Sequence, residues 1–291
     1  MIQSLSHDDP AAMEREARSV VEATAHGSEL PHCHVPVKDY RARLTRGTQV
    51  HELPEIFFQF SGTNEFHCGQ QRFTLKPGEI CIMPAGVPHS EIGDGDNFSA
   101  MVIVHDPNRF LILAMKCEPG RAPWAVPTTT CEISNGQQLT DLLSEAAASK
   151  LRNSPAAPHL LRGYLGMVLE SIDRPIPASD RHYSPLVAQC MDLLFAEASS
   201  TDLTLNQVAQ RLNCNADSLS ARFSREVGKT AIEYLTERRI AKASRLLLNG
   251  YLQVAEVAWA CGYRDPNYFS RLFKKQMGST PIDFKKQHRN R

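Results

Sequence analysis

The sequence predicts an α+β protein of two domains: a small β-barrel with following helices, and then an all-α domain that contains the same helical unit twice. Three observations predict this architecture. Short segments of alternating hydrophobicity fill the first third of the chain, a helical pattern near the C-terminus repeats an earlier one, and a polar, proline-rich stretch separates the two parts. With 291 residues and 42% hydrophobic content, the chain is long enough for two separate cores.

The N-terminal part is expected to begin with an amphipathic helix over residues 11–25 and to continue as short β-strands. Glycine and proline mark turns between these strands at Gly62, Gly69, Pro77-Gly78 and Pro84-Ala85-Gly86. Short, evenly spaced strands are typical of a small double-sheet barrel. The expected strands are 40–44, 56–60, 64–68, 71–75, 80–83, 90–92 and 99–104.

Two helices are expected in the middle of the chain, over residues 137–151 and 158–173. The second carries an apolar stripe formed by Leu161, Leu165 and Val168. Residues 173–180 are polar and contain two prolines, so this segment is interpreted as an exposed interdomain linker.

An internal repeat defines the C-terminal part, which opens with a helix expected over residues 186–195. Val208, Ala209 and Asn213 recur 49 residues later as Val257, Ala258 and Gly262. Phe223, Gly228, Thr230 and Tyr234 recur 50 residues later as Phe273, Gly278, Thr280 and Phe284. The two copies therefore differ by one residue at a turn between two helices, and such a repeat is a strong architectural signal.

Each copy has the pattern of a helix-turn-helix unit. Asn215 and Asp265 occupy matching N-cap positions before the second helix, and Pro266 suits its first turn. A connecting helix over residues 232–249, closed by Gly250, is long enough to hold two recognition helices about 34 Å apart, one turn of DNA.

The second copy has a face suited to reading base pairs. Helical spacing turns Phe269, Phe273 and Met277 inward, so the opposite face presents Asn267, Ser270, Arg271 and Lys274. Arg271 suits guanine and Asn267 suits adenine, because both side chains can make two hydrogen bonds to these bases. The expected phosphate contacts are Lys274, Lys275, Lys285 and Lys286.

In the first copy, the same spacing turns Leu219, Phe223 and Val227 inward. Its outward face carries short side chains, flanked by two arginines that suit phosphates. The expected DNA-facing residues of this copy are Asp217, Ser218, Ser220, Ala221, Arg222 and Arg225.

Charge separates the same two parts. From Ser184 onward there are 16 Lys and Arg against 10 Asp and Glu, a net +6, whereas the remainder carries −6 and the whole chain zero. A basic module joined to an acidic domain is a pattern of DNA-binding proteins.

From Ser184 to the end, the chain resembles the DNA-binding domain of AraC/XylS-type transcriptional regulators. Two residues depart from that family's pattern: Ala221 replaces a long polar or basic residue, and Ala231 replaces a frequent proline. The resemblance implies promoter DNA, RNA polymerase and a second copy of the chain as partners, and activation of a catabolic operon. It rests on Tyr234-Leu235, Arg239, Ala243, Leu246-Leu247, Ala258, Gly262-Tyr263, Tyr268-Phe269, Arg271, Phe273-Lys274-Lys275, Gly278, Thr280-Pro281 and Phe284.

The N-terminal part resembles a cupin effector domain. Gly78-x5-Pro84-x-Gly86-x2-His89 matches the second cupin motif, and His51-x3-Glu55-x6-Gly62 matches most of the first. Metal-dependent cupins place ligands at His51, Glu55 and His89. Here Gln49 replaces another ligand histidine and Gly93 replaces the final motif residue, so no metal and no cofactor are assigned.

We therefore expect these polar groups to bind a small-molecule effector, such as a sugar or another catabolite, at the mouth of the barrel. Strand alternation sends Phe57 and Gln59 to the same side. The expected effector-binding residues are Gln49, His51, Glu55, Phe57, Gln59 and His89.

In the resembled family, the helix that carries Leu161, Leu165 and Val168 pairs two protomers. Packing of this helix on its own barrel is an equal alternative. The eight cysteines form no CxxC pair, and the short His32-Cys33-His34 and His67-Cys68 runs lack partners at ligand spacing. No segment reaches the roughly 20 apolar residues of a membrane span, so a cytoplasmic protein without a membrane partner is expected.

The sequence thus predicts a dimeric, ligand-responsive transcription activator that is not an enzyme. The alternatives are a metal-dependent cupin enzyme fused to a DNA-binding domain, and a ligand-independent regulator controlled by a partner protein. The expected domains are an effector-binding barrel over 1–135, a helical coupling segment over 136–172, a linker over 173–183 and a DNA-binding domain over 184–291.

Overall fold

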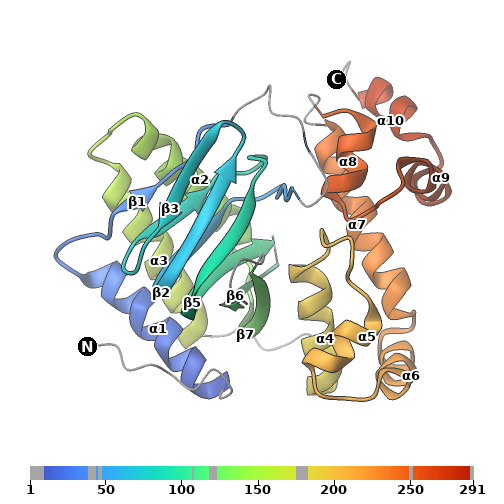
Figure 1. Ribbon diagram of the computed structural model, residues 1–291, viewed down its shortest axis with the longest axis horizontal. Helices are drawn as coiled ribbons and strands as arrows, with labels where there is room; N and C mark the ends of the chain where they lie inside the picture. The colour runs from blue at the N-terminus through green and yellow to red at the C-terminus, as the bar shows by residue number, and fades with distance from the viewer. Residues whose placement is uncertain are drawn as a thin grey trace. The chain divides into compact units, whose positions relative to one another are not determined.

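The computed structural model describes residues 10–38, 44, 48–106, 108–117, 123–174, 183–248 and 252–288. The chain forms two compact units (Figure 1). The first unit comprises Met1–Asp39 and Leu53–Asp180, and the second comprises Tyr40–Glu52 and Arg181–Arg291. The contacts thus group residues 40–52 with the helical C-terminal part, although the sequence places them beside the barrel strands. Of the strand expected over 40–44, residues 40–43 lie outside the described residues, and Leu44 is in no strand.

The first unit is built on one strongly curved sheet of seven described strands. Its order is β1-β4-β2-β5-β6-β7, and β3 pairs with the far half of β2. All pairs are antiparallel except β1 with β4. The strands are β1 (Cys33–His34), β2 (Glu55–Cys68), β3 (Gln71–Leu75), β4 (Ile80–Met83), β5 (Ser90–Asp106), β6 (Arg109–Lys116) and β7 (Trp124–Glu132).

Two of these strands are longer than the sequence indicates. The strands expected over 56–60 and 64–68 form the single strand β2, and those over 90–92 and 99–104 form β5. Gly62 therefore does not end a strand. It has a φ of 64° and lies where the pairing of β2 with β5 shifts register, so it forms a bulge that bends the strand. β1, β6 and β7 were not predicted from the sequence.

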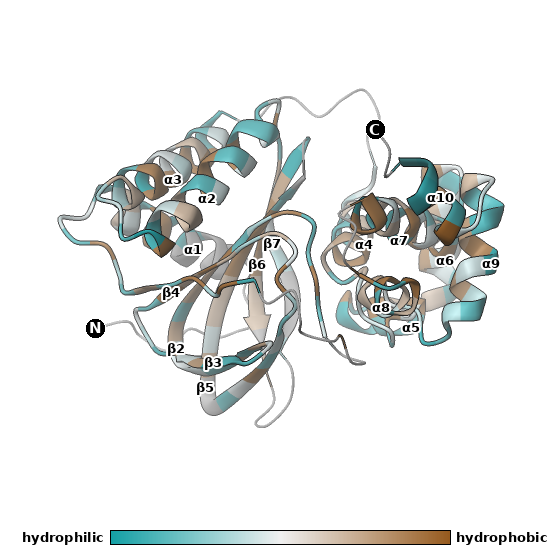
Figure 2. Cartoon of the chain, turned by 90° about the horizontal axis from the view of Figure 1, so that it is seen from above, coloured by the Kyte–Doolittle hydropathy of each residue, from teal (hydrophilic) through white to brown (hydrophobic). Residues whose placement is uncertain are grey.

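Three helices cover one face of this sheet (Figure 2). They are α1 (Pro10–His26), α2 (Gly136–Leu151) and α3 (Ala157–Asp173), close to the bounds that the sequence predicts. Their apolar sides form one core with alternate residues of the strands, such as Ile56, Phe58 and Ile103. The opposite face of the sheet lines the interior of the barrel.

The stripe on α3 faces this core. Leu161, Leu165 and Val168 are 3%, 0% and 0% exposed and pack with sheet residues and with α1 and α2. Their side chains therefore pack within their own unit, which is the alternative that the sequence left open for this helix, and their assignment to dimerisation stays a prediction. Of the linker expected over 173–183, Asp173 ends α3, and residues 175–182 lie outside the described residues.

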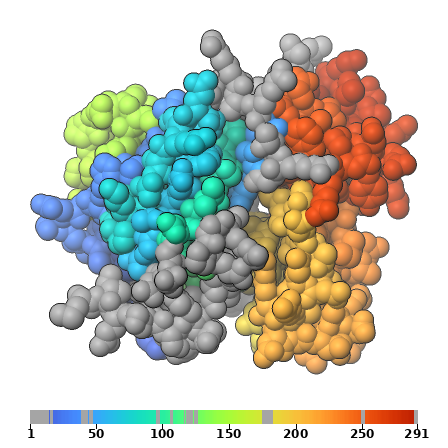
Figure 3. All heavy atoms as spheres, in the orientation of Figure 1, coloured from blue at the N-terminus to red at the C-terminus, as the bar shows by residue number. Residues whose placement is uncertain are grey.

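The second unit is helical, and its helices run from yellow to red in the space-filling view (Figure 3). None of the helices in the described residues is long and apolar enough to cross a membrane. The helices are α4 (Pro185–Ala196), α5 (Leu205–Arg211), α6 (Ala216–Val227), α7 (Ala231–Leu248), α8 (Val254–Ala260), α9 (Pro266–Met277) and α10 (Pro281–His288).

The internal repeat is confirmed at the level of single hydrogen bonds. The N–H of Cys214 donates to the carbonyl of Ala209, and that of Tyr263 donates to Ala258, each at 2.9 Å. Asn213 and Gly262 both have positive φ, at 51° and 78°. The extra residue of the second copy lies in the turn, because four residues separate α5 from α6 and five separate α8 from α9.

Residues from the segment before β2 complete the core of the second unit. Leu44 and Val50 are buried there together with residues of α7, α8 and α9. The N–H of Leu44 lies 3.3 Å from a carboxylate oxygen of Glu256, and Arg245 forms a 3.0 Å ion pair with Glu52. This segment is thus an integral part of the second helix-turn-helix unit.

Candidate DNA-binding surface and barrel interior

Side-chain caps set the start of both recognition helices, as the sequence predicts. The side-chain oxygen of Asn215 accepts a hydrogen bond from the N–H of Ser218 at 2.9 Å, and that of Asp265 accepts one from Asn267 at 2.8 Å. Both helices end at a left-handed glycine, Gly228 or Gly278. The outward faces of α6 and α9 are therefore held in a defined register.

On α9, Phe269 and Phe273 are fully buried, whereas Met277 is 40% exposed, contrary to the inward position predicted for it. The core ends one turn earlier, because Met277 is the last residue before the Gly278 cap. The residues expected to face DNA lie on the solvent side, and the hydroxyl of Ser270 donates to the carbonyl of Pro266 at 2.8 Å. Those exposed are Asn267, Arg271, Lys274 and Lys275, with Ser270 half-buried.

On α6, Leu219 and Phe223 are fully buried and Val227 is half-buried. The opposite face carries short polar side chains and two arginines, of which Arg225 lies 3.9 Å from Glu226. Those exposed are Asp217, Ser218, Ala221, Arg222 and Arg225, with Ser220 half-buried. This face therefore offers charge but few long side chains that could reach base edges.

Two residues near α9 differ from the sequence-based interpretation. Lys285 donates to the carbonyl of Leu252 at 2.9 Å, so it ties α10 to the loop before α8, whereas Lys286 is exposed. Tyr268 is 52% exposed beside Asn267 and was not singled out as a DNA-facing residue. Helical spacing could have found it, because Tyr268 falls one position before the buried Phe269.

Arg239 on α7 fixes the second unit internally. Its guanidinium donates to the carbonyls of Ala198 and Ser200 at 2.8 and 2.7 Å and lies 5.3 Å from the centre of the Tyr263 ring. The buried Lys242 adds a 2.6 Å hydrogen bond to Ser199. The chain after α4 and the turn of the second copy therefore share one anchor on α7.

Both views show α6 and α9 toward the same side of this unit (Figures 1 and 2).

The barrel interior contains the polar residues that the alternation of β2 predicts. Glu55, Phe57 and Gln59 are buried, while the intervening Ile56 and Phe58 face the helices. The ring of Phe57 lies 5.2 Å from that of Phe66 and 6.4 Å from that of His89, measured between ring centres. The interior thus combines aromatic rings with a few polar groups.

Asn64 and Glu91 join these groups and were missed in the sequence. The amide of Asn64 donates to a carboxylate oxygen of Glu91 at 2.8 Å, and the imidazole Nε2 of His89 lies 3.9 Å from the other oxygen. Burial, with a smaller contribution from the charge of Glu55, raises the pKa of Glu91 to about 7. Strand alternation could have found both, since Asn64 precedes the buried Phe66 by two positions and Glu91 follows His89 by two.

Two acceptor oxygens of the interior, Oε1 of Gln59 and Oδ1 of Asn64, are buried without a hydrogen-bond partner among the described residues. Leaving a buried acceptor unsatisfied costs on the order of 1–3 kcal/mol. Such groups require an explanation, and a bound polar molecule is one.

The motif residues at the start of β2 are also close together. The imidazole Nε2 of His51 lies 3.2 Å from Oε1 of Gln49, and one potential ligand atom from each of His51, Glu55 and His89 lies within 4.8 Å of the others. At the other departure from the cupin pattern, a side chain on Gly93 would collide with the Cys117 side chain and approach the Phe98 ring to 3.1 Å. The barrel therefore has no room for a larger residue at position 93.

Comparison with known proteins agrees with both units. A family model described as a helix-turn-helix domain matches residues 208–287, and one described as a cupin domain matches residues 42–105. The HTH-type transcriptional activator RhaR of Salmonella dublin is 31% identical over 258 residues, covering 86% of this chain and 91% of its own. RhaR of Enterobacter sp. (strain 638) is 27% identical over 269 residues, covering 88% and 92%.

Among solved structures, the C-terminal domain of AraT, a response regulator from Geobacillus stearothermophilus, is 37% identical, with a TM-score of 0.36. That match covers 38% of this chain and 88% of the other.

A cupin barrel followed by two helix-turn-helix units defines a DNA-binding transcription regulator. Because a relative of that kind matches most of its length, the chain belongs to the AraC/XylS-type family of transcription regulators.

Proposed function

We propose that the protein activates transcription from a promoter that α9 reads by sequence and α6 contacts mainly through phosphates, under the control of a small molecule bound inside the barrel. The observation that carries the DNA-binding part is the exposed face of α9, opposite the buried Phe269 and Phe273.

On this face, Asn267 and Arg271 lie in the first half of α9, one turn apart, and are exposed. Residues near the N-terminal end of a recognition helix meet base edges, and those further along meet phosphates. We therefore assign base contacts to Asn267 and Arg271, with Ser270 in a minor role because its hydroxyl bonds its own helix. Lys274 and Lys275 contact phosphates.

The α6 face is proposed to position the protein rather than to select a sequence. Ser218, Ser220 and Ala221 are short, and Asp217 carries a charge that phosphates repel. Arg222 and Arg225 are long enough to reach the phosphate backbone. Most of the sequence preference is then expected in the half-site that α9 occupies.

The test compares two variants of α9 on specific and random DNA. Arg271→Ala is expected to cost about 1–3 kcal/mol of specific binding and to relax the preference at one base pair. Lys275→Ala is expected to weaken binding to all sequences similarly and to reduce the salt slope by about 1. Fluorescence anisotropy at several salt concentrations measures both. An equal loss on specific and random DNA for Arg271→Ala would exclude it as a base-reading residue.

The small-molecule site is proposed among Phe57, Gln59, Asn64, His89 and Glu91. Gln59 and Asn64 offer buried acceptor oxygens, so a ligand with hydroxyl or amide donors would satisfy them. A sugar or another polar catabolite has such donors. Gln49, His51 and Glu55 lie close to this group in the chain or in space and complete the proposed set.

Ligand-dependent thermal stabilisation tests this site. A metabolite that binds the folded protein at 100 times its Kd adds about 2.7 kcal/mol of stability. Gln59→Met should abolish the shift, because it removes the acceptor at similar volume. Gln71→Met is the matched control, since the Gln71 amide bonds the carbonyl of Val37 and Gln71 is not in the proposed set. If both variants keep the shift, Gln59 is not part of the site.

The remaining partners follow from the class of protein. We propose that the chain acts in the cytoplasm as a homodimer that contacts RNA polymerase at the promoter, and that it catalyses no reaction. Dimerisation would then use surfaces other than the buried stripe of α3. Multi-angle light scattering gives the oligomeric state, and transcription in vitro with purified polymerase shows whether the protein activates.

A further inference from the structure

A second group of potential ligands lies at β1 and at the turn between β3 and β4, and it shares no residue with the small-molecule site proposed above. It begins at β1, which pairs with β4 so that Cys33 lies beside Ile80 and His34 beside Cys81. The N–H of Ile80 also donates to the carbonyl of His32 at 2.9 Å. Because side chains alternate along an extended segment, His32 and His34 share one face and Cys33 has the other.

Cys33 takes no part in this group. It packs against the core between the sheet and the helices, on the other face of β1. The two imidazoles are the groups that β1 presents on the face opposite Cys33.

The third group, Glu79, is held by the turn between β3 and β4. The N–H of Glu79 donates to the carbonyl of Lys76 at 2.9 Å, and Gly78 has a φ of 82°, as a turn with Pro at its second and Gly at its third position requires. The Lys76 N–H in turn donates to Oε2 of Glu79 at 2.9 Å. This hydrogen bond holds the carboxyl group of Glu79 at the turn.

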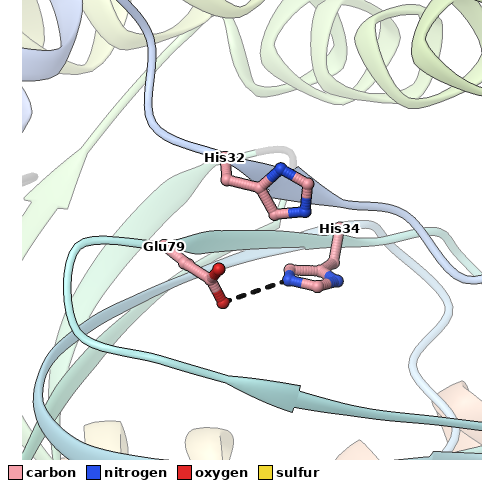
Figure 4. Close-up of side chains that lie close together, drawn as sticks. All are labelled: His32, His34 and Glu79. Atoms are coloured by element: carbon pink, nitrogen blue, oxygen red, sulfur yellow. Dashed lines mark hydrogen bonds and ion pairs between the residues drawn. The ribbon is translucent and has the colours of Figure 1, made fainter.

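The imidazole of His34 is oriented by two neighbours. Its ring is stacked on that of Phe73, with ring centres 4.8 Å apart and an interplanar angle of 8°. Its Nε2 lies 3.2 Å from Oε2 of Glu79. The His32 ring meets it edge-on with centres 4.6 Å apart, and all three side chains converge on one region between the two segments (Figure 4).

From this convergence we propose that His32, His34 and Glu79 form a binding site for a divalent transition-metal ion such as Zn²⁺. One ligand atom from each lies within 4.8 Å of the others. Two imidazole nitrogens and one carboxylate oxygen are a ligand set of zinc sites with an open position, and they suit borderline ions better than Mg²⁺ or Ca²⁺.

Small movements would complete this geometry. Bond lengths of 2.0–2.2 Å place tetrahedral ligand atoms roughly 3.3 Å apart. The pair of His34 and Glu79 is already at 3.2 Å, so the remaining adjustment falls on His32. His32 is exposed, and its side chain can therefore rotate toward the pair without disturbing the core.

A bound ion would also have a mechanical effect. The described part of β1 is two residues long and lies at one end of the strand order of the sheet. An ion shared by β1 and the β3–β4 turn would tie this short edge strand to the barrel. An ion that binds only the folded state also raises the thermal stability of the protein.

The test is a calorimetric titration of the full-length chain with Zn²⁺, with any histidine tag removed and with a phosphine reductant, which keeps thiols reduced and binds zinc weakly. His32→Ala changes an exposed side chain, and Glu79→Gln keeps the carbonyl oxygen that accepts from Lys76. His67→Ala is the matched control, because its Nε2 lies 2.7 Å from Glu65 in a similar pair that belongs to no three-ligand group among the described residues. Glu55→Gln reports on the separate group at the start of β2.

The proposal predicts one ion per chain, with affinity reduced by roughly tenfold or more in His32→Ala and Glu79→Gln, since even outer-shell mutations typically cost 10–100-fold. His67→Ala and Glu55→Gln should bind as the parent does. Affinity that is unchanged in His32→Ala, or that is lost only in Glu55→Gln, would overturn the proposal. Thermal unfolding of each variant without zinc shows whether its barrel is folded.

Discussion

The turn of the second helix-turn-helix unit depends on the absence of one side chain. Gly262 has a φ of 78°, and a Cβ at this position would lie 2.8 Å from the carbonyl oxygen of Ala198 and 2.8 Å from the guanidinium of Arg239. These are the groups that join α7 to the chain after α4. The position of α9 therefore depends on a glycine at position 262.

Gly262→Ala is expected to destabilise the protein by about 1–3 kcal/mol beyond the cost of positive φ, because the new methyl group must displace a carbonyl or the buried Arg239. Urea unfolding measures the difference. Gly278→Ala is the matched control, since Gly278 has a similar φ of 75° but open space around it. An equal loss of stability in the two variants would show that the close approach at Gly262 does not contribute to the free energy of unfolding.

The carboxyl group of Glu91 predicts a pH dependence of stability. Its pKa rises from an ordinary value of about 4.5 in the unfolded chain to about 7 in the fold, so the folded state binds more protons between these values. Stability is therefore lost as pH rises from about 5 to 7 and is level above. Glu55 and His89 are the other ionisable groups beside Glu91.

Glu91→Gln should remove this contribution, because an amide does not titrate. Relative to the variant, the parent chain is expected to lose on the order of 2–3 kcal/mol between pH 5 and pH 7.5. Denaturant unfolding at several pH values gives both curves. Parallel curves would show that Glu91 titrates near its ordinary pKa.

For single residues, local sequence rules predicted the helix caps but did not identify the buried polar groups. Asn215 and Asp265 could be identified because a cap acts within three residues of sequence. Asn64 and Glu91 could not be paired, because their hydrogen bond depends on the register of β2 with β5, 27 positions apart in the chain. The inward position predicted for Met277 was wrong, because helical spacing identifies the buried face of a helix but not the residue at which the core beneath it ends.

At the scale of elements, α6 and α9 are equivalent in length and caps but not in chemistry. Both have 12 residues and a left-handed glycine at the C-terminal end. One presents Asn267 and Arg271, whereas the other presents serines and an alanine at the corresponding face. Duplicated architecture with unequal faces favours one helix that selects sequence and one that adds affinity.

The strands show where sequence patterns stop being informative. β6 is a continuous apolar run, which periodicity cannot distinguish from a buried helix. β7 contains Pro127, which normally argues against a strand, but β7 lies at the end of the strand order and its pairing shifts register there. The strands β3 and β4 have turn residues at both ends, and both were predicted to the residue.

The packing of α3 gives a prediction at the same scale. Leu165 is fully buried against its own unit, so Leu165→Ala should cost about 2–5 kcal/mol of stability through the cavity that it leaves. The dimer affinity of the chain that remains folded should not change. Unfolding curves and light scattering over a concentration series separate the two effects. A variant with native stability and a weakened dimer would return Leu165 to the subunit interface.

At the scale of the whole molecule, the chain passes between the two units three times, after residues 39, 52 and 180. Val50 lies in the core of the second unit, and nine residues later Gln59 lies inside the barrel. A short continuous segment thus belongs to both cores. The basic charge gathers after Ser184, so the chain as a whole is neutral although its DNA-binding part is not.

Although its net charge is zero, the chain is expected to bind a particular DNA sequence through its C-terminal unit. The most direct measurement is an anisotropy titration of the purified protein on its own upstream promoter region and on random DNA of equal length, at two salt concentrations. We expect promoter binding on the order of a thousandfold tighter than random binding, with both weakened by salt. Equal affinity for the two DNAs at both salt concentrations would contradict it.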